Sequence, residues 1–230
     1  MNQLNFSESG SMNQPLVLFI HGGFTSSESF ANQHDFLDGF HCLFIDLPEY
    51  GKSLECGLFS YENAAELMID LMDTYSPNEK VILVSHSYGG LAVKKLLEVC
   101  PERIDKVVIG STNILRTPLY FFYTRWIGNL SLCWLNRKRF KEEKISWNLV
   151  CRTQKAAWRN FTIPDASKFS AIPALLIYAQ YDIKDIKKSM YQWQKFFSDS
   201  QLVEIQNAGH NYFWDFPEET NAAIRGFLCP

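Results

Sequence analysis

Six short and almost wholly apolar runs recur along the chain. They span residues 15–20, 41–45, 81–85, 106–110, 173–179 and 201–205. Near-continuous hydrophobicity over such short lengths is typical of strands that are covered on both faces, as in a parallel sheet. The chain is therefore expected to build its core around a mostly parallel sheet.

Segments with helical spacing separate these runs and close the chain. Apolar residues recur at helical intervals in residues 60–75, 88–100, 186–197 and 217–228. Strands that alternate with helices indicate stacked βαβ units. The 230 residues fit one domain of this class, and a hydrophobic content of 47% supports a sizeable core. We predict an α/β fold whose mostly parallel central sheet is flanked by helices, with six parallel strands and the option of one edge strand.

Residues 111–170 interrupt the alternation. No clear strand is visible there, and the composition shifts towards tryptophan, phenylalanine, arginine and lysine. The segment holds 11 Lys and Arg against 3 Asp and Glu, although the whole chain has a net charge of −3. This charge asymmetry, and the position between two strands, predict a small helical lid inserted into a core made of residues 1–110 and 171–230.

Charge, cysteines and terminal sequence narrow the class of protein. A net charge of −3 gives the chain no strong overall attraction for nucleic acid. The six cysteines are scattered, without a C-x-x-C pair or a histidine at metal-binding spacing, so we expect free thiols and no metal site. The N-terminus has no basic and apolar regions of a secretory signal, and no apolar stretch approaches the roughly 18 residues of a membrane span. A cytoplasmic location is expected.

The sequence SHSYGG (residues 85–90) directly follows an apolar run. Ser87 would lie on the sharp turn between a strand and a helix, where small neighbours let the backbone bend and the side chain leaves the carboxyl end of the sheet. The start of the following helix favours the negative charge that forms when an ester is attacked. The alternative is an ordinary turn with small residues at a helix start.

Three further segments follow apolar runs and should reach the same edge of the sheet. HGGF (residues 21–24) offers main-chain N–H groups of small residues, and Asp182 and His210 each follow a later run. A histidine beside a serine, oriented by a carboxylate, makes the weak serine hydroxyl nucleophilic. Asp185 competes with Asp182 as the carboxylate. Either aspartate could instead be an N-cap, and His210 could simply cap the last helix.

Together these segments resemble the motifs of α/β-hydrolase fold proteins, over nearly the whole chain outside residues 111–170. HGGF resembles the family's H-G-x oxyanion loop, DLPEYGKS (46–53) its D-x-P-G-x-G-x-S loop, SHSYGG its nucleophile elbow, AQYD (179–182) the segment that carries the acid, and AGHNYFWDFPEETNAAIRGFL its histidine loop and last helix. The resemblance implies Ser87 as nucleophile, His210 as base and Asp182 as carboxylate. It also implies an oxyanion hole made by the main-chain N–H groups of Gly23 and Tyr88.

The chain departs from the family pattern at two glycine positions. Ser85 replaces the first glycine of the elbow and adds a side chain where helix and strand pack closely. Glu49 replaces a glycine in the 46–53 loop and is expected to bring a negative charge towards the rim of the site. Of the neighbouring histidines, His86 is expected to point away from the nucleophile into packing, and His21 to support its loop by hydrogen bonding.

The resemblance implies a lidded serine hydrolase of the carboxylesterase type, which cleaves an ester or thioester through an acyl-enzyme without a metal or organic cofactor. Its lid would contribute substrate-binding aromatic residues, namely Trp126, Trp134, Trp147 and Trp158, unless these only pack the lid onto the core. The basic lid, if it is more than a solvated helix face, suggests an acidic partner such as an acyl carrier protein, a coenzyme A thioester or an anionic lipid surface. The most specific form is an esterase for acyl-carrier-linked methyl esters, like the biotin-pathway esterases of this superfamily.

Two other functions are compatible with the same motifs. The same triad serves C–C bond hydrolysis, lyase and acyl-transfer reactions in the superfamily. The fold could also be a non-catalytic small-molecule receptor, although a receptor has no need for all three of the serine, aspartate and histidine.

Overall fold

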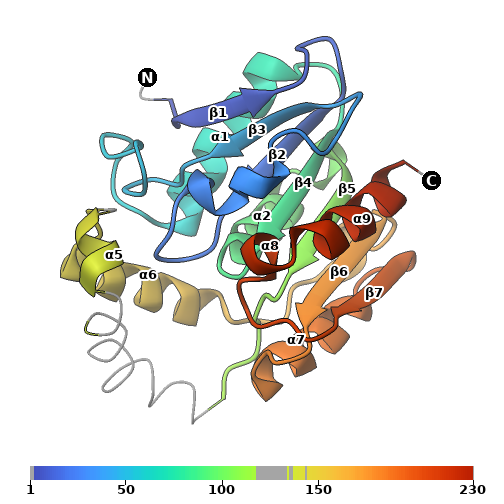
Figure 1. Ribbon diagram of the computed structural model, residues 1–230. Coiled ribbons are helices and arrows are strands. Elements are labelled where there is room, and N and C mark those ends of the chain that lie inside the picture. Colours follow the sequence, from blue (N-terminus) through green and yellow to red (C-terminus); the bar gives the residue numbers. More distant parts are fainter. Residues whose placement is uncertain (1–2, 118–133, 135–136, 143, 230) are drawn as a thin grey trace.

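The computed structural model describes residues 3–117, 134, 137–142 and 144–229, which surround a seven-stranded sheet (Figure 1). The strands are β1 (Phe6–Ser9), β2 (Leu16–Ile20), β3 (His41–Ile45), β4 (Val81–His86), β5 (Ile104–Gly110), β6 (Ala174–Ala179) and β7 (Ser200–Ile205). Their order across the sheet is β1-β3-β2-β4-β5-β6-β7. Strand β1 is antiparallel to β3, and all the other neighbours are parallel. The predicted parallel sheet is confirmed, and the optional edge strand is β1.

Burial on both faces explains the continuous apolar runs. Every residue of β2 is buried. Leu16, Leu18 and Ile20 belong to one hydrophobic cluster, while Val17 and Phe19 belong to a second cluster on the opposite face. Successive side chains of a strand point to opposite faces, so a sheet that is covered twice needs an apolar residue at every position.

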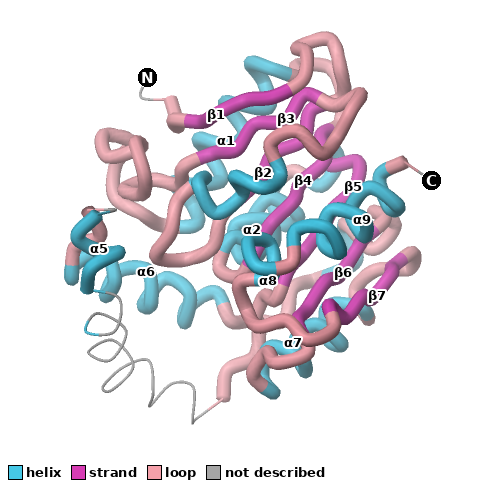
Figure 2. Tube along the Cα trace, in the orientation of Figure 1, coloured by secondary structure: helices cyan, strands magenta, loops and turns pink. Residues whose placement is uncertain are grey.

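Helices form the two covering layers (Figures 1 and 2). One layer contains α1 (Tyr61–Tyr75), α2 (Gly89–Val99) and α7 (Lys184–Gln194), and the other contains the 3-10 helix η1 (Ser27–Gln33), α8 (Tyr212–Asp215) and α9 (Pro217–Leu228). The four predicted helical segments are confirmed, with α7 ending before residue 197 because Phe196 and Phe197 follow in turns with buried rings. Among the described residues, no helix is long and apolar enough to cross a membrane.

The described part of residues 111–170 is helical. It contains α5 (Arg137–Glu142), α6 (Trp147–Asn160) and the 3-10 turn η4 (Ala166–Lys168). Helix α6 begins at Ser146, whose side chain accepts a hydrogen bond from the N–H of Leu149, as N-cap residues do. Leu149, Val150 and Ala157 are buried in the same cluster as the α1–α2 side of the sheet. Helix α6 therefore packs directly on the core.

Three consecutive residues of α6 also make polar contacts with the core. The pairs are Arg152 with the Glu49 carboxylate, Thr153 Oγ1 with Tyr50 OH at 2.6 Å, and Gln154 Oε1 with Tyr88 OH at 2.8 Å. Glu49 has a left-handed φ of 67°, which explains the resemblance to a glycine position. Its carboxylate also accepts the N–H of Phe59 at 2.6 Å. The negative charge that Glu49 was expected to bring towards the rim is paired with Arg152 of α6.

The start of α2 lies directly against the end of β2. A Cβ atom on Gly89 would lie 2.3 Å from the carbonyl oxygen of Ile20 and 2.6 Å from that of His21. Main-chain atoms of a central strand cannot move aside cheaply. Only glycine therefore allows this approach.

We predict opposite effects for two Gly→Ala substitutions in helices. Gly89→Ala should lower the free energy of unfolding by about 1–3 kcal/mol, the usual cost of overpacking. Gly226→Ala in α9 meets no atom within 4 Å and should raise it by about 0.5–1 kcal/mol, because alanine loses less conformational freedom on folding. Urea denaturation measures both changes in the free energy of unfolding. Equal effects of the two substitutions would contradict the close packing of α2 on β2.

Candidate functional site

A strained turn carries Ser87 at the carboxyl end of β4. Ser87 has a φ of 53°, a left-handed conformation that costs energy in any residue with a side chain. Its N–H donates to the carbonyl oxygen of Gly110 at 2.7 Å, and its own carbonyl accepts the N–H of Gly90 at 3.0 Å. These bonds hold the sharp strand-to-helix turn that SHSYGG predicts.

The three side chains of the predicted triad lie in contact. Ser87 Oγ is 3.0 Å from His210 Nε2, and His210 Nδ1 is 2.7 Å from Asp182 Oδ1. The Asp182 side chain is 1% exposed, whereas that of His210 is 39% exposed. Both distances are those of hydrogen bonds. The arrangement can pass the hydroxyl proton to the imidazole while the carboxylate holds the opposite ring nitrogen.

Ser111 completes the surroundings of Asp182. The Asp182 Oδ2 atom accepts hydrogen bonds from Ser111 Oγ and from the Ala179 N–H. Burial alone would raise the pKa of Asp182, but the hydrogen bond and charge of His210, with the bonds from Ser111 and Ala179, hold that pKa below its ordinary value. The carboxylate is therefore ionised at neutral pH. Sequence reasoning missed Ser111, because a serine after a strand does not by itself indicate a hydrogen bond to a carboxylate far away in sequence.

The competing carboxylate, Asp185, has a different partner. It lies in the first turn of α7 and accepts a hydrogen bond from Thr117 Oγ1 at 2.7 Å. The structure places Asp182, rather than Asp185, against the imidazole of His210.

His21 supports the loop after β2. Its Nδ1–H donates to the carbonyl oxygen of Gly22 at 2.7 Å, and its Nε2 accepts the N–H of Leu47 at 3.0 Å. Burial lowers the pKa of His21, so the ring stays neutral and can play both roles at once. The expected supporting role of His21 is confirmed.

The two glycines of this loop lie against the turn at Ser87. A Cβ atom on Gly22 would lie 3.1 Å from Ser87 Cβ, and one on Gly23 would lie 2.5 Å from Tyr88 Cδ2. Only glycine permits so close an approach. Gly22 therefore lies against Ser87, and Gly23 lies against the ring of Tyr88; Gly23 and Tyr88 are the two predicted oxyanion donors.

Ser85 occupies the position of the family's first elbow glycine without entering the site. Its side chain is buried, and its Oγ donates to the carbonyl oxygen of Val108 on β5 at 3.1 Å. The extra atoms are accommodated between two strands.

A cavity of about 430 Å³ lies over Ser87. Its walls come from the glycine loop, η1, the turn at Ser87 and α8. Among the described residues that line it, Glu28 and Asp215 are the acidic ones, Trp214 adds an exposed aromatic surface, and none is lysine or arginine. The described lining thus suits an uncharged or cationic group.

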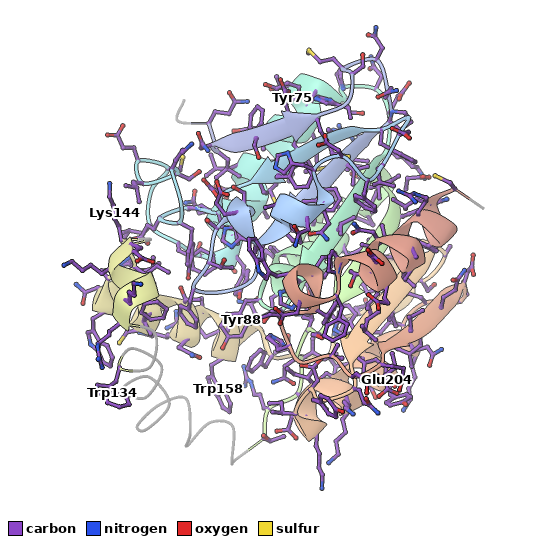
Figure 3. All side chains as sticks on the ribbon, viewed as in Figure 1. Tyr75, Tyr88, Trp134, Lys144, Trp158 and Glu204 are labelled. Carbon is purple, nitrogen blue, oxygen red and sulfur yellow. The ribbon has the colours of Figure 1, made fainter. Side chains whose placement is uncertain are left out.

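The tryptophans predicted to bind substrate do not line this cavity where they are described. Trp134 is 67% exposed and lies near α5 (Figure 3), and Trp147 is 47% exposed. Trp158 is half-buried, with its ring 6.3 Å from that of Phe161. Trp126 lies outside the described residues.

His86 differs in part from expectation. It packs edge-on against Tyr212 and also contacts Phe213, but it lines the cavity as well, and its Nε2 is 2.8 Å from the main-chain oxygen of His210. Burial, followed by the charge of nearby His210, lowers the pKa of His86 to about 3. The predicted packing of His86 is confirmed, but the sequence did not predict that its ring also reaches the cavity and the loop of His210. Its partner lies on a loop remote in sequence, so no local pattern could reveal the contact.

Comparison with known proteins finds a matching family model and several relatives. A family model described as the alpha/beta hydrolase family matches residues 17–223. Epoxide hydrolase 1 of Caenorhabditis elegans is 32% identical over 98% of this chain and 68% of its own length. The pimeloyl-acyl-carrier-protein methyl ester esterase of Wigglesworthia glossinidia brevipalpis is 26% identical over 91% of this chain and 90% of its own length.

Other matches are shorter or more distant. Three further curated relatives align over only 34%, 38% and 37% of their own lengths. A thermophilic esterase from Thermogutta terrifontis has a similar structure, with a TM-score of 0.74 at 20% identity over 98% of this chain and 92% of that one. At this identity the likeness supports the fold alone.

The two buried histidines predict a loss of stability in mild acid. Because the pKa values of His21 and His86 are lowered from 6.5, the unfolded chain binds protons at pH values where the folded protein does not. The free energy of unfolding should fall as the pH drops below about 6.5, by up to about 1.4 kcal/mol per pH unit for each histidine. In His86→Gln, the free energy of unfolding, measured by urea denaturation at several pH values, should depend less steeply on pH. The reason is that one of the two contributing histidines is absent. An unchanged slope would mean that His86 titrates alike in the folded and unfolded states.

Proposed function

The chain belongs to the alpha/beta hydrolase family, and we propose that it is a serine hydrolase that cleaves a carboxylic ester or thioester through an acyl-enzyme. The observation that carries this proposal is the unbroken series of contacts from Ser87 to His210 to Asp182, at 3.0 and 2.7 Å, at a cavity. A nucleophile, a base and a carboxylate that orients the base are the groups that acyl transfer needs.

In the proposed mechanism, Ser87 Oγ attacks the acyl carbon while His210 Nε2 takes its proton. Asp182 accepts the Nδ1–H and stabilises the imidazolium that forms. The main-chain N–H groups of Gly23 and Tyr88 receive the oxyanion, close to the N-terminus of α2. His210 then returns its proton to the leaving group and activates a water molecule, which releases the acid from Ser87.

The serine itself favours acyl chemistry over epoxide opening, the reaction in the name of one relative. If Ser87 opened an epoxide, the product would be an ether on the serine side chain. An ether has no carbonyl carbon to which water can add, whereas an acyl-enzyme has one. An epoxide hydrolase with this residue as its nucleophile would not turn over.

We also propose that residues 111–170 act as a helical lid on the core of residues 1–110 and 171–230. Helix α6 packs on the core, and its Gln154 holds the hydroxyl of Tyr88, whose N–H is a proposed oxyanion donor. Through this contact the insert would help to fix the oxyanion hole as well as cover it.

Labelling with a fluorophosphonate tests the nucleophile and the base. Wild-type protein should gain the mass of one adduct, Ser87→Ala should gain none, and His210→Ala should react far more slowly because its serine is not deprotonated. Hydrolysis of small esters should fall by several orders of magnitude, about 10⁴-fold or more, in both variants. Ser198→Ala, which changes an exposed serine elsewhere on the chain, should behave as wild type.

The other outcomes separate the alternatives. An adduct on Ser87 without turnover of any ester would favour C–C bond hydrolysis, lyase or acyl-transfer chemistry. Wild-type protein that fails to label, under conditions that label a known serine hydrolase, would contradict the proposal and favour a receptor.

An acyl-carrier-linked methyl ester is a second candidate substrate. Two observations favour it: the relative from Wigglesworthia that is named for this activity, and a cavity of about 400 Å³ between α6 and the start of α1 that Arg152, Lys155 and Arg159 line. An acidic carrier would contact Lys155 and Arg159, since Arg152 is paired with Glu49. The uncharged ester end would enter the cavity over Ser87. The charges of Glu28 and Asp215 in that cavity would oppose an anionic group there.

Salt and charge neutralisation at this contact distinguish the candidates. For a carrier-linked methyl ester, kcat/KM should fall as salt rises and should fall again in the double variant Lys155→Gln/Arg159→Gln, because charge steering is screened by ions. A small methyl ester should show neither effect. The double variant Lys80→Gln/Lys195→Gln removes the same charge from exposed positions elsewhere and serves as control. If carrier-linked and free esters respond alike to salt and to these substitutions, the proposal of an acidic partner is contradicted.

A further inference from the structure

We propose that His86 is a positioning residue for the base: its Nε2–H donates a hydrogen bond to the main-chain carbonyl of His210 and so fixes the loop that carries the imidazole. The inference rests on the proposed function, in which His210 takes the proton of Ser87. His86 directly precedes the proposed nucleophile Ser87, and it would affect catalysis by positioning the base His210.

The contacts of His86 link the turn at Ser87 to the loop that carries His210. Its Nε2 lies 2.8 Å from the His210 carbonyl oxygen, and the two imidazole rings are 4.8 Å apart between centroids. The ring is 8% exposed and packs against Tyr212 and Phe213, which begin α8. The His86 side chain therefore fills the space between β4 and the loop that carries His210. Its Nε2 atom faces the main-chain carbonyl oxygen of His210.

The acceptor fixes the tautomer of His86. A carbonyl oxygen can only accept, so the ring nitrogen 2.8 Å away must carry the proton. Because burial keeps the ring neutral, Nδ1 is then the bare nitrogen. A neutral ring also leaves the imidazolium of His210 without a second positive charge beside it when the base is protonated.

The loop has other anchors, but none so close to the imidazole. The N–H of Asn207 donates to Gln180 Oε1 at 2.7 Å, and the carbonyl of Ala208 accepts the N–H of Tyr181 at 2.9 Å. In the described part of the chain, no other group donates to the carbonyl of His210. Without His86, the carbonyl of His210 would lose the one donor that the described residues give it.

Position matters because proton transfer depends steeply on geometry. The side chain of His210 is 39% exposed, so packing alone does not hold the ring against Ser87. A displacement of about 1 Å at a reacting group can reduce the rate by about a hundredfold. Loss of the His86 hydrogen bond should therefore act on kcat rather than on substrate binding.

Two variants of almost equal shape test the hydrogen bond. Glutamine and methionine have similar length and volume, but only glutamine ends in an N–H donor near the position of the histidine Nε2. His86→Met should lower kcat and the rate of fluorophosphonate labelling by about ten- to a hundredfold, with KM nearly unchanged. His86→Gln should restore most of both rates. Thermal unfolding of both variants shows whether each is folded at the assay temperature.

The outcomes separate this inference from the proposed function. If wild-type protein does not label, the proposed function fails. If wild-type protein labels and both variants match it, or both are equally impaired while folded, the donor has no role and the inference is overturned.

A second measurement does not depend on the folding of any variant. The ¹⁵N–¹H spectrum of the wild-type histidine side chains, with the signals of His86 assigned through its contacts with the rings of Tyr212 and Phe213, should show the proton on Nε2 at pH 7 and also at pH 5. A proton on Nδ1 instead would overturn the inference, since a bare Nε2 cannot donate to the carbonyl of His210.

Discussion

The left-handed turn at Ser87 is the constraint on which the rest of the site depends. A residue with a side chain adopts this conformation only where its surroundings enforce it. Here Gly89 lets α2 approach the main chain of β2, and Gly22 lets the preceding loop approach Ser87 Cβ. The close packing of helix, strand and loop thus fixes the backbone, and the backbone directs the hydroxyl towards His210.

Neutral histidines hold the segments around this turn. His21 joins the glycine loop to the end of β3 through Gly22 and Leu47, and His86 joins β4 to the loop of His210. A neutral imidazole can donate from one nitrogen and accept at the other, so it can connect two main chains in one tautomer. Burial keeps both rings uncharged.

The sequence was enough to predict the elements whose environment is regular. Continuous apolar runs located the parallel strands, and helical spacing located α1, α2, α7 and α9. The short helix α8 and the 3-10 helix η1 were not predicted, because a few residues rich in aromatic and polar side chains carry no periodic signal. Their positions depend on packing against the sheet.

The distinction between features with a local sequence pattern and features that depend on packing also applies to the site. Ser87, Asp182 and His210 follow strands and could be placed from motif order alone. The roles of Glu49, His86 and Ser111 could not, since each depends on a partner far away in sequence: Arg152, His210 and Asp182, respectively. Local patterns predict which residues reach an edge of the sheet, but not which side chains meet there.

The three polar contacts between α6 and the core have a consequence for protein engineering. Arg152, Thr153 and Gln154 contact Glu49, Tyr50 and Tyr88 of the core. A chimaera that exchanged the whole insert would remove the cation from Glu49 and the acceptor from Tyr88. A junction placed before Ser146, the N-cap of α6, would instead keep these contacts and let the preceding segment be replaced as a separate module.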